Sequence, residues 1–228
     1  PLLQSSDVVA IDLPGHGWSD HRPLGSRYHF VDYIPAVLDA MTALAWPKCV
    51  LLGHSLGAAI ATFTAAVEPN RVQGLFLIDG LGPHSETPQE AQARLQRSIR
   101  EFSESVDKID IEYSDLNQMI DARRQAGRVG KQGAALLVAR NTVPSETGYR
   151  WRSDPRLRLP NPQYMSEEQI HAYIKQVKAP TLLVMASEGM LRGRATTKER
   201  IGILPKLKIE ELPGGHHLHL DDPAPIAR

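Results

Sequence analysis

The stretch from Lys48 to Ala66 constrains the fold more than any other part of the sequence. It consists of a short apolar run, the pentapeptide GHSLG at positions 53–57, and a segment rich in alanine. A serine exposed on so tight a turn needs flanking positions with almost no side chain, and Gly53 and Gly57 meet that need. A helix that begins after the serine directs its free N–H groups toward it. Strand, turn and helix in this order predict a nucleophile elbow with Ser55 at its tip.

Other apolar segments indicate the rest of the architecture. Residues 8–12, 72–78 and 181–186 each read as a buried strand, and residues 207–212 read as the last strand. Helical spacing of apolar residues over 32–46 predicts a helix before the elbow. Strands that alternate with helices of this size favour a parallel sheet with right-handed crossovers. Functional side chains gather at the carboxyl ends of such strands, where Ser55, Asp79 and Glu188 all lie.

Three motifs carry a resemblance to a known superfamily. They are DLPGHG at 12–17, GHSLG at 53–57, and the segment that begins with Gly215 and His216. Through them the chain resembles the α/β-hydrolase superfamily over nearly its whole length. Within that superfamily it is similar to the serine hydrolase-like proteins through 141–159 and 180–191.

The resemblance implies an α/β-hydrolase fold, with a mostly parallel sheet, flanking helices and an inserted helical cap. We expect residues 1–81 and 179–228 to form the core and residues 82–178 to form the cap. Periodicity in the cap predicts helices over 89–102, 116–125, 131–140 and 166–177, the last of them opened by a capping box of Ser166 and Gln169. Residues 144–162, rich in Pro and Arg, read as a loop.

Compared with that family, the first strands, the loop that donates half of the oxyanion hole, and the closing helix are all missing. The strand at 8–12 would then lack a partner and leave an open sheet edge. We therefore expect the 228-residue chain, produced by itself, not to be a working enzyme.

A serine hydroxyl needs a neighbouring base, and histidine suits this role because its pKa lies near neutrality. Three histidines follow the last expected strand. The family resemblance places the base directly after the loop glycine and seven residues before a proline, which selects His216 after Gly215. His217 and His219 are expected to pack or to line the rim. Together with the two aspartates that follow, the cluster lacks a recognised metal-ligand spacing, so we expect no metal.

A carboxylate must then orient the imidazole and stabilise its protonated form. Glu188 follows the strand at 181–186, the usual place in the family, and precedes His216 by 28 residues. Asp79 follows the strand at 72–78, where some relatives such as haloalkane dehalogenases keep their acid; it could otherwise cap the turn there. We expect Glu188 to be the acid, with Asp79 as the alternative. The backbone N–H of Leu56 is the expected oxyanion donor.

The serine narrows the reaction class. Dehalogenases and epoxide hydrolases attack with a carboxylate at the elbow, and position 55 is a serine. The resemblance implies hydrolysis of a carboxylic ester or related acyl bond of a small molecule through an acyl-enzyme, as in esterases, lipases, thioesterases and amidases, without a cofactor. C–C bond hydrolases and haloperoxidases use the same triad, and some members of the fold bind small molecules without cleaving them. These alternatives stay open.

Composition limits the partners. Lys and Arg together number 26, as do Asp and Glu, so no global field favours nucleic acid or an anionic membrane. No apolar run approaches the ~18 residues that span a bilayer. The single Cys49 cannot form an internal disulfide and fits a reducing compartment, which predicts a cytoplasmic location. Nothing in the sequence indicates the oligomeric state.

Charge is uneven within the expected cap. Residues 82–121 hold nine acidic and four basic side chains, whereas residues 123–158 hold nine basic and two acidic ones. The basic half could attract an acidic substrate. We expect instead that the two halves face each other or water, the usual arrangement of charge runs.

Overall fold

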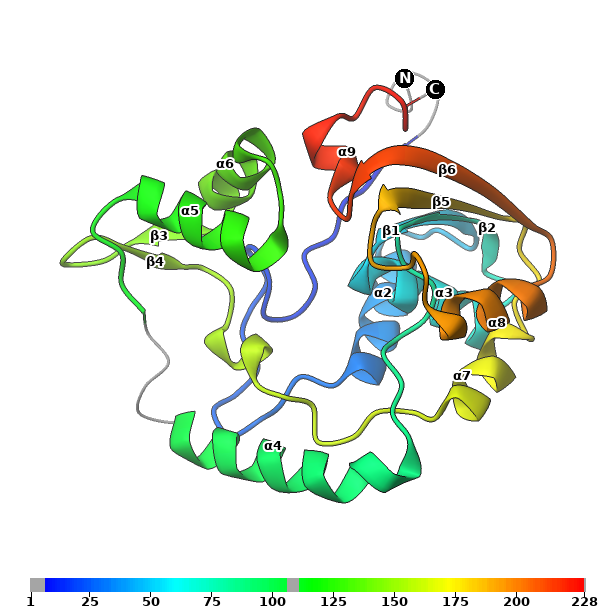
Figure 1. The fold of residues 1–228 in the computed structure, drawn as a ribbon, viewed down its shortest axis with the longest axis horizontal. Helices are drawn as coiled ribbons and strands as arrows, with labels where there is room; N and C mark the ends of the chain where they lie inside the picture. Colours follow the sequence, from blue (N-terminus) through cyan, green and yellow to red (C-terminus); the bar gives the residue numbers. More distant parts are fainter. Residues whose placement is uncertain (1–6, 106–110, 228) are drawn as a thin grey trace.

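A four-stranded parallel sheet forms the centre of the computed structural model, which describes residues 7–105 and 111–227 (Figure 1). The strand order is β1-β2-β5-β6, and all three pairings are parallel. The predicted α/β fold with a parallel sheet is therefore confirmed. The bounds are β1 (Cys49–His54), β2 (Val72–Ile78), β5 (Thr181–Glu188) and β6 (Leu207–Gly215).

Helices cover the sheet, and α3 packs on it most closely. Each of its residues from Ala58 to Ala66 is buried, and Phe63 shares a core with Leu77 of β2 and Leu183 of β5. The alanines predicted to let this helix approach the sheet thus do so. The helices that lie outside the segment between β2 and β5 are η1 (Phe30–Asp32), α2 (Tyr33–Ala43), α3 (Leu56–Val67), α8 (Ala195–Ile203) and α9 (Leu218–Asp221). Helix α8 was not predicted from the sequence.

The expected strand at 8–12 is not formed. Residues 8–12 have no regular secondary structure, and the side chains of Val8, Val9 and Ile11 are all exposed. A strand exists only through pairing, and within the described residues no segment forms a ladder with this one. Val50 and Leu52 on the outer strand β1 are exposed as well. The prediction of a buried strand at 8–12 was therefore wrong.

The chain between β2 and β5 is mostly helical, and all four helices predicted there are present. Its elements are η2 (Pro88–Glu90), α4 (Ala91–Ser105), α5 (Leu116–Gly127), α6 (Lys131–Arg140), β3 (Thr142–Pro144), β4 (Tyr149–Trp151), η3 (Pro155–Arg158) and α7 (Glu167–Ile174). The capping box of Ser166 and Gln169 opens α7 as expected. The antiparallel pair β3-β4 was missed because each strand has three residues, too few to show a period. In Figure 1, α4, α5 and α6 lie apart from the sheet, and α6 contacts α9.

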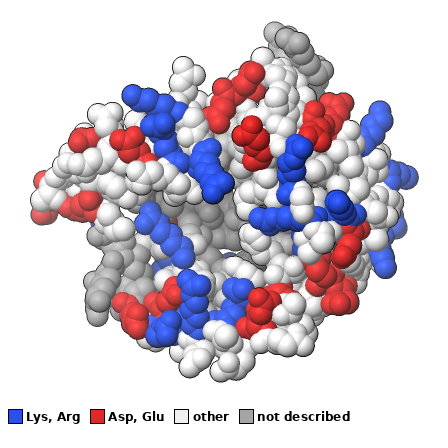
Figure 2. All heavy atoms as spheres, viewed as in Figure 1, with Lys and Arg blue, Asp and Glu red and all other residues white. Residues whose placement is uncertain are grey.

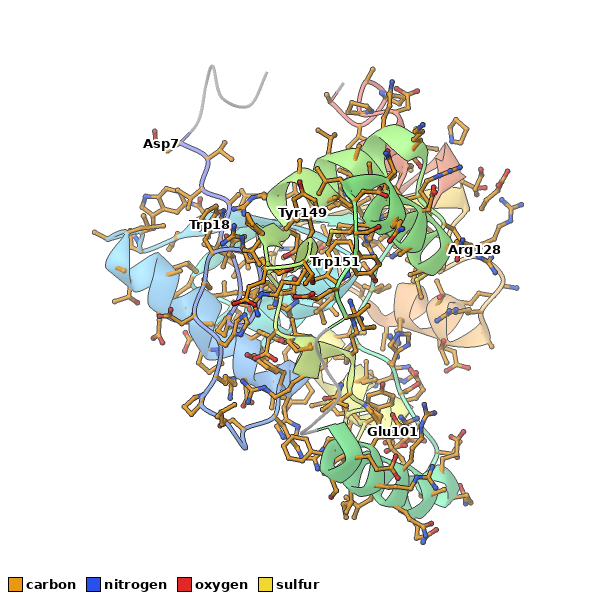
Figure 3. The ribbon with its side chains drawn as sticks, turned by 90° about the vertical axis from the view of Figure 1, so that its left-hand side faces the viewer. Asp7, Trp18, Glu101, Arg128, Tyr149 and Trp151 are labelled. Carbon is orange, nitrogen blue, oxygen red and sulfur yellow. The ribbon has the colours of Figure 1, made fainter. Side chains whose placement is uncertain are left out.

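A buried ion pair joins this inserted segment to the loop before α2. The carboxylate of Asp154, 2% exposed, accepts hydrogen bonds from Arg156 and from the hydroxyl of Tyr28 at 2.6 Å. Arg156 also donates to the carbonyl oxygens of Pro23 at 2.7 Å and Ser26 at 3.1 Å. Nearby, the Arg152 guanidinium lies 3.6 Å from the ring of Trp18, which Figure 3 shows on the same side as Tyr149 and Trp151. These contacts fix the insertion against the core.

We predict that Asp154→Ala lowers the free energy of unfolding by about 3–5 kcal/mol, because it leaves the Arg156 charge and the Tyr28 hydroxyl without their partner in a buried place. Urea unfolding of the full-length protein measures this. Asp121→Ala, which breaks an ion pair whose carboxylate is 63% exposed, is the control and should cost about 0–1 kcal/mol. Equal losses in the two variants would contradict the structural role of Asp154.

Candidate active site

Ser55 lies on a strained turn between β1 and α3. Its φ of 52° and ψ of −113° are unfavourable for a residue with a side chain. The strain is held in place because the backbone N–H of Ser55 donates to the carbonyl of Ile78 on the neighbouring strand, at 3.1 Å. The serine side chain is thereby presented at the carboxyl edge of the sheet. This geometry is the nucleophile elbow that the pentapeptide predicted.

Two glycines, Gly53 and Gly80, leave room for this turn. Gly53 was expected, whereas Gly80 takes the place of the expected Gly57. A Cβ on Gly53 would collide with the backbone of Gly57, so the first glycine is required as predicted. A Cβ on Gly57 would meet no atom within 4 Å in the part of the chain that the structure describes, so the predicted crowding there is wrong. Gly80 takes that role, since its Cβ would lie 2.7 Å from the carbonyl oxygen of Ser55. Its position two residues past the end of β2 was the available signal.

His216 lies between Ser55 and Asp79. Its Nδ1 is 2.6 Å from Oδ2 of Asp79, and its Nε2 is 2.9 Å from Oγ of Ser55. A carboxylate can only accept, so Nδ1 carries the proton and Nε2 of the neutral ring is free to accept from the serine hydroxyl. The histidine side chain is 14% exposed and the aspartate fully buried. The structure brings Ser55 and His216 together as the sequence predicted.

The carboxylate of Asp79 is held by the turn that follows β5. Burial raises its pKa, but hydrogen bonds from His216 and from the backbone of Met190 and Ala186 outweigh burial and hold the pKa below its usual value. The Met190 N–H donates to Oδ2 at 2.7 Å. Any Cβ on Gly189 would collide with the carboxylate, so this turn can approach Asp79 only with glycine there. The aspartate is thus ionised and fixed in the orientation that His216 needs.

The expected pairing of Glu188 with His216 is not formed. Glu188 is exposed at the end of β5, and Nδ1 of His216 is already bonded to Asp79. The physical reason lies in the turn after β5. The Met190 N–H of this turn donates to Asp79, which follows the neighbouring strand β2, while the side chain of Glu188 stays exposed. Asp79, the alternative in the sequence analysis, is the acid that the geometry selects.

Leu56, the expected oxyanion donor, is the first residue of α3. The N–H groups of a helix's first turn have no acceptor within the helix. The Leu56 N–H directly follows Ser55, and within the described residues it has no backbone acceptor outside the helix. The positive end of the α3 dipole adds to its effect on a developing negative charge.

Three further imidazoles, those of His54, His217 and His219, gather near His216. The ring of His54 lies 4.5 Å from that of His216, 5.0 Å from that of His217 and 4.2 Å from that of His219. Nε2 of His54 is 2.7 Å from the carbonyl oxygen of His216 and donates to it. Burial, followed by the neighbouring imidazoles, lowers the pKa of His54 to about 3, and burial lowers that of His217 to about 4. His54, His217 and His219 thus pack as neutral rings. Among the described residues no group of three or more metal-ligating side chains is arranged to hold an ion.

Comparison with known proteins places this chain in a family. Residues 1–223 match the family described as the alpha/beta hydrolase fold. The chain belongs to the α/β-hydrolase fold family. A probable serine hydrolase of Drosophila melanogaster is 32% identical over 243 residues, covering 100% of this chain and 72% of that protein.

Two solved structures are similar as well. A hypothetical protein of Pseudomonas aeruginosa PAO1 is 36% identical with a TM-score of 0.87, over 93% of this chain and 76% of the other. The thioesterase domain from the curacin biosynthetic pathway is 26% identical with a TM-score of 0.78, over 95% and 77% of the two chains. These similarities agree with membership of the α/β-hydrolase fold family. In the described residues no helix is long and apolar enough to cross a membrane.

The buried imidazoles predict a dependence of stability on pH. Between pH 6.5 and about pH 4 the unfolded chain binds a proton on His217 that the folded protein does not bind, so stability falls as the pH falls through this window. We predict that His217→Phe makes the fall shallower by up to about 1.4 kcal/mol per pH unit, the contribution of one proton. Urea unfolding at several pH values measures the slope. Parallel profiles for the two proteins would contradict the neutral state of His217.

Proposed function

We propose that this chain is a serine hydrolase that cleaves a carboxylic ester or a related acyl bond, such as a thioester, of a small molecule. The hydrogen-bonded series from Ser55 through His216 to Asp79 carries the proposal. A serine hydroxyl becomes a useful nucleophile only beside such a base, and the base works only when its tautomer is fixed. The similarity to a probable serine hydrolase and to a thioesterase domain supports the same reaction class.

The residues act in a defined order in this proposal. His216 takes the proton of Ser55 through Nε2 as Oγ attacks the substrate carbonyl, and Asp79 stabilises the imidazolium that forms. The Leu56 N–H donates to the oxyanion of the tetrahedral intermediate. Collapse of the intermediate transfers the proton from His216 to the leaving group and leaves an acyl-enzyme on Ser55. Water, activated by the same imidazole, then releases the acid and restores the serine.

We also propose that residues 82–178 act as a cap over this site. Support comes from the contact between the turn that joins α5 to α6 and the segment after His216. The Gly130 N–H donates to Oδ1 of Asp221 at 2.8 Å, and Gly133 also packs on Asp221. A segment held against Asp221, close in sequence to His216, would border the path by which a substrate reaches Ser55. It would determine which substrates reach Ser55.

Covalent labelling tests the proposal. In the full-length protein a fluorophosphonate probe should label Ser55, and Ser55→Ala should abolish labelling and reduce turnover of p-nitrophenyl butyrate by about 10³-fold or more. Ser103→Ala, at an exposed serine of α4, is the matched control and should change neither result. A small-molecule-binding homologue without activity would take no label. Turnover near the wild-type rate in Ser55→Ala would contradict the assignment of the nucleophile.

A further inference from the structure

Several arginines of the basic run 123–158, half-buried or exposed, already have a partner within the protein, such as Arg152, which stacks on Trp18. Arg156 pairs with Asp154, and Arg140 pairs with Asp12 of the core at 2.8 Å. Arg124 pairs with Asp121 one turn earlier on α5, at 3.5 Å. Arginines with these contacts are engaged within the protein and leave little charge for a ligand.

Arg123 on α5 differs from them. Its side chain is half-buried, and in residues 7–105 and 111–227 it has neither an ion pair nor a hydrogen bond with another side chain. Burial alone lowers the pKa of its guanidinium, with no carboxylate opposing the shift. Removing a guanidinium from water without a counter-charge costs free energy, so such a group has affinity for an anion.

The surroundings of Arg123 connect it to the candidate active site. A Cβ on Gly127 would lie 3.4 Å from Cζ of Arg123 and 3.2 Å from Nε2 of His217, so the two side chains border the same space. The ring of His217 is in turn 4.9 Å from that of His216. His217 is 7% exposed, and its Nδ1 has no hydrogen-bond partner within the described residues. One imidazole therefore separates the guanidinium from the candidate base, and it carries an unused polar atom.

The charge balance of this space favours one kind of ligand. The pKa of about 4 keeps His217 neutral at physiological pH, since burial disfavours its cation. Two fixed charges act on this imidazole, the cation of Arg123 and the carboxylate of Asp221, and Asp221 already accepts a hydrogen bond from the Gly130 N–H, whereas no carboxylate shifts the pKa of Arg123. A guanidinium presents two parallel N–H donors that match a carboxylate. A dianionic phosphate would need more than one cation. Figure 2 shows Lys and Arg side chains on several sides of a central hollow, which would attract an anionic substrate.

We propose that Arg123 binds a carboxylate carried by the substrate, a few bonds from the ester or thioester that Ser55 attacks. This inference rests on the proposed function and specifies its substrate class: acyl compounds whose acyl chain ends in a negative charge. Arg123 contributes to substrate specificity and takes no part in proton transfer. The aliphatic part of such a substrate would pass beside His217.

Two esters that differ in one carboxylate test the inference. The ratio of kcat/KM for mono-p-nitrophenyl glutarate over p-nitrophenyl butyrate is measured in the full-length protein and its variants. Arg123→Gln should lower this ratio about 10- to 100-fold, mainly through KM, which corresponds to the loss of one charge-assisted hydrogen-bonded pair. Arg123→Lys should restore part of it, because the charge returns without the fork. Arg124→Gln removes the same charge from the next residue and should leave the ratio unchanged.

Binding without turnover separates this inference from the proposed function. In the Ser55→Ala background, calorimetric titration with monomethyl glutarate should show binding that Arg123→Gln weakens at least about 10-fold and Arg124→Gln does not. If the wild type hydrolyses neither ester, the proposed function fails and this titration alone decides the inference. An unchanged ratio or affinity in Arg123→Gln, an equal effect of Arg124→Gln, or tighter binding of inorganic phosphate than of monomethyl glutarate would overturn it.

Discussion

The hydrogen bond between the buried carboxylate of Asp79 and Nδ1 of His216 is the interaction on which the rest of the site depends. Because the aspartate is fully buried, its charge must be satisfied by donors within the protein. His216 supplies one of them, and the backbone of Ala186 and Met190 supplies the others. The same bond fixes the tautomer that leaves Nε2 free toward Ser55. A misplaced carboxylate would therefore cost both stability and the activation of the serine.

That requirement explains features of the chain that have no catalytic atoms. Gly189 is needed because any side chain there would occupy the place of the carboxylate, and Gly80 is needed because the strained turn at Ser55 passes directly over it. The parallel register of the strands brings the relevant ends together, since the last residue of β1 pairs with that of β2, and β2 pairs with β5. Three neighbouring strands thus each contribute one part: the serine, the acid, and the donors that hold the acid.

The sequence predicted the parts of the site that depend on local pattern. The elbow around Ser55 and the strands β2 and β5 could be found because tight turns need glycine and buried strands need apolar runs. The choice between Glu188 and Asp79 could not be made locally, because both follow a strand end and only the turn after β5 decides which is held. The strand expected at 8–12 failed for a related reason: its apolar residues are present, but pairing depends on a partner far away in the sequence. Arg123 was part of a basic run that only its burial distinguishes.

Substitution of the two candidate acids tests the central claim most directly. In the full-length protein, kcat/KM for p-nitrophenyl butyrate is compared among the wild type, Asp79→Asn and Glu188→Gln, which change charge with little change in size. The hydrogen bond to His216 predicts a loss of about 10⁴-fold in Asp79→Asn, because the amide can donate to Nδ1 and stabilise the wrong tautomer. Glu188→Gln should stay within a few-fold of the wild type. A large loss in Glu188→Gln together with near-normal turnover in Asp79→Asn would contradict the account.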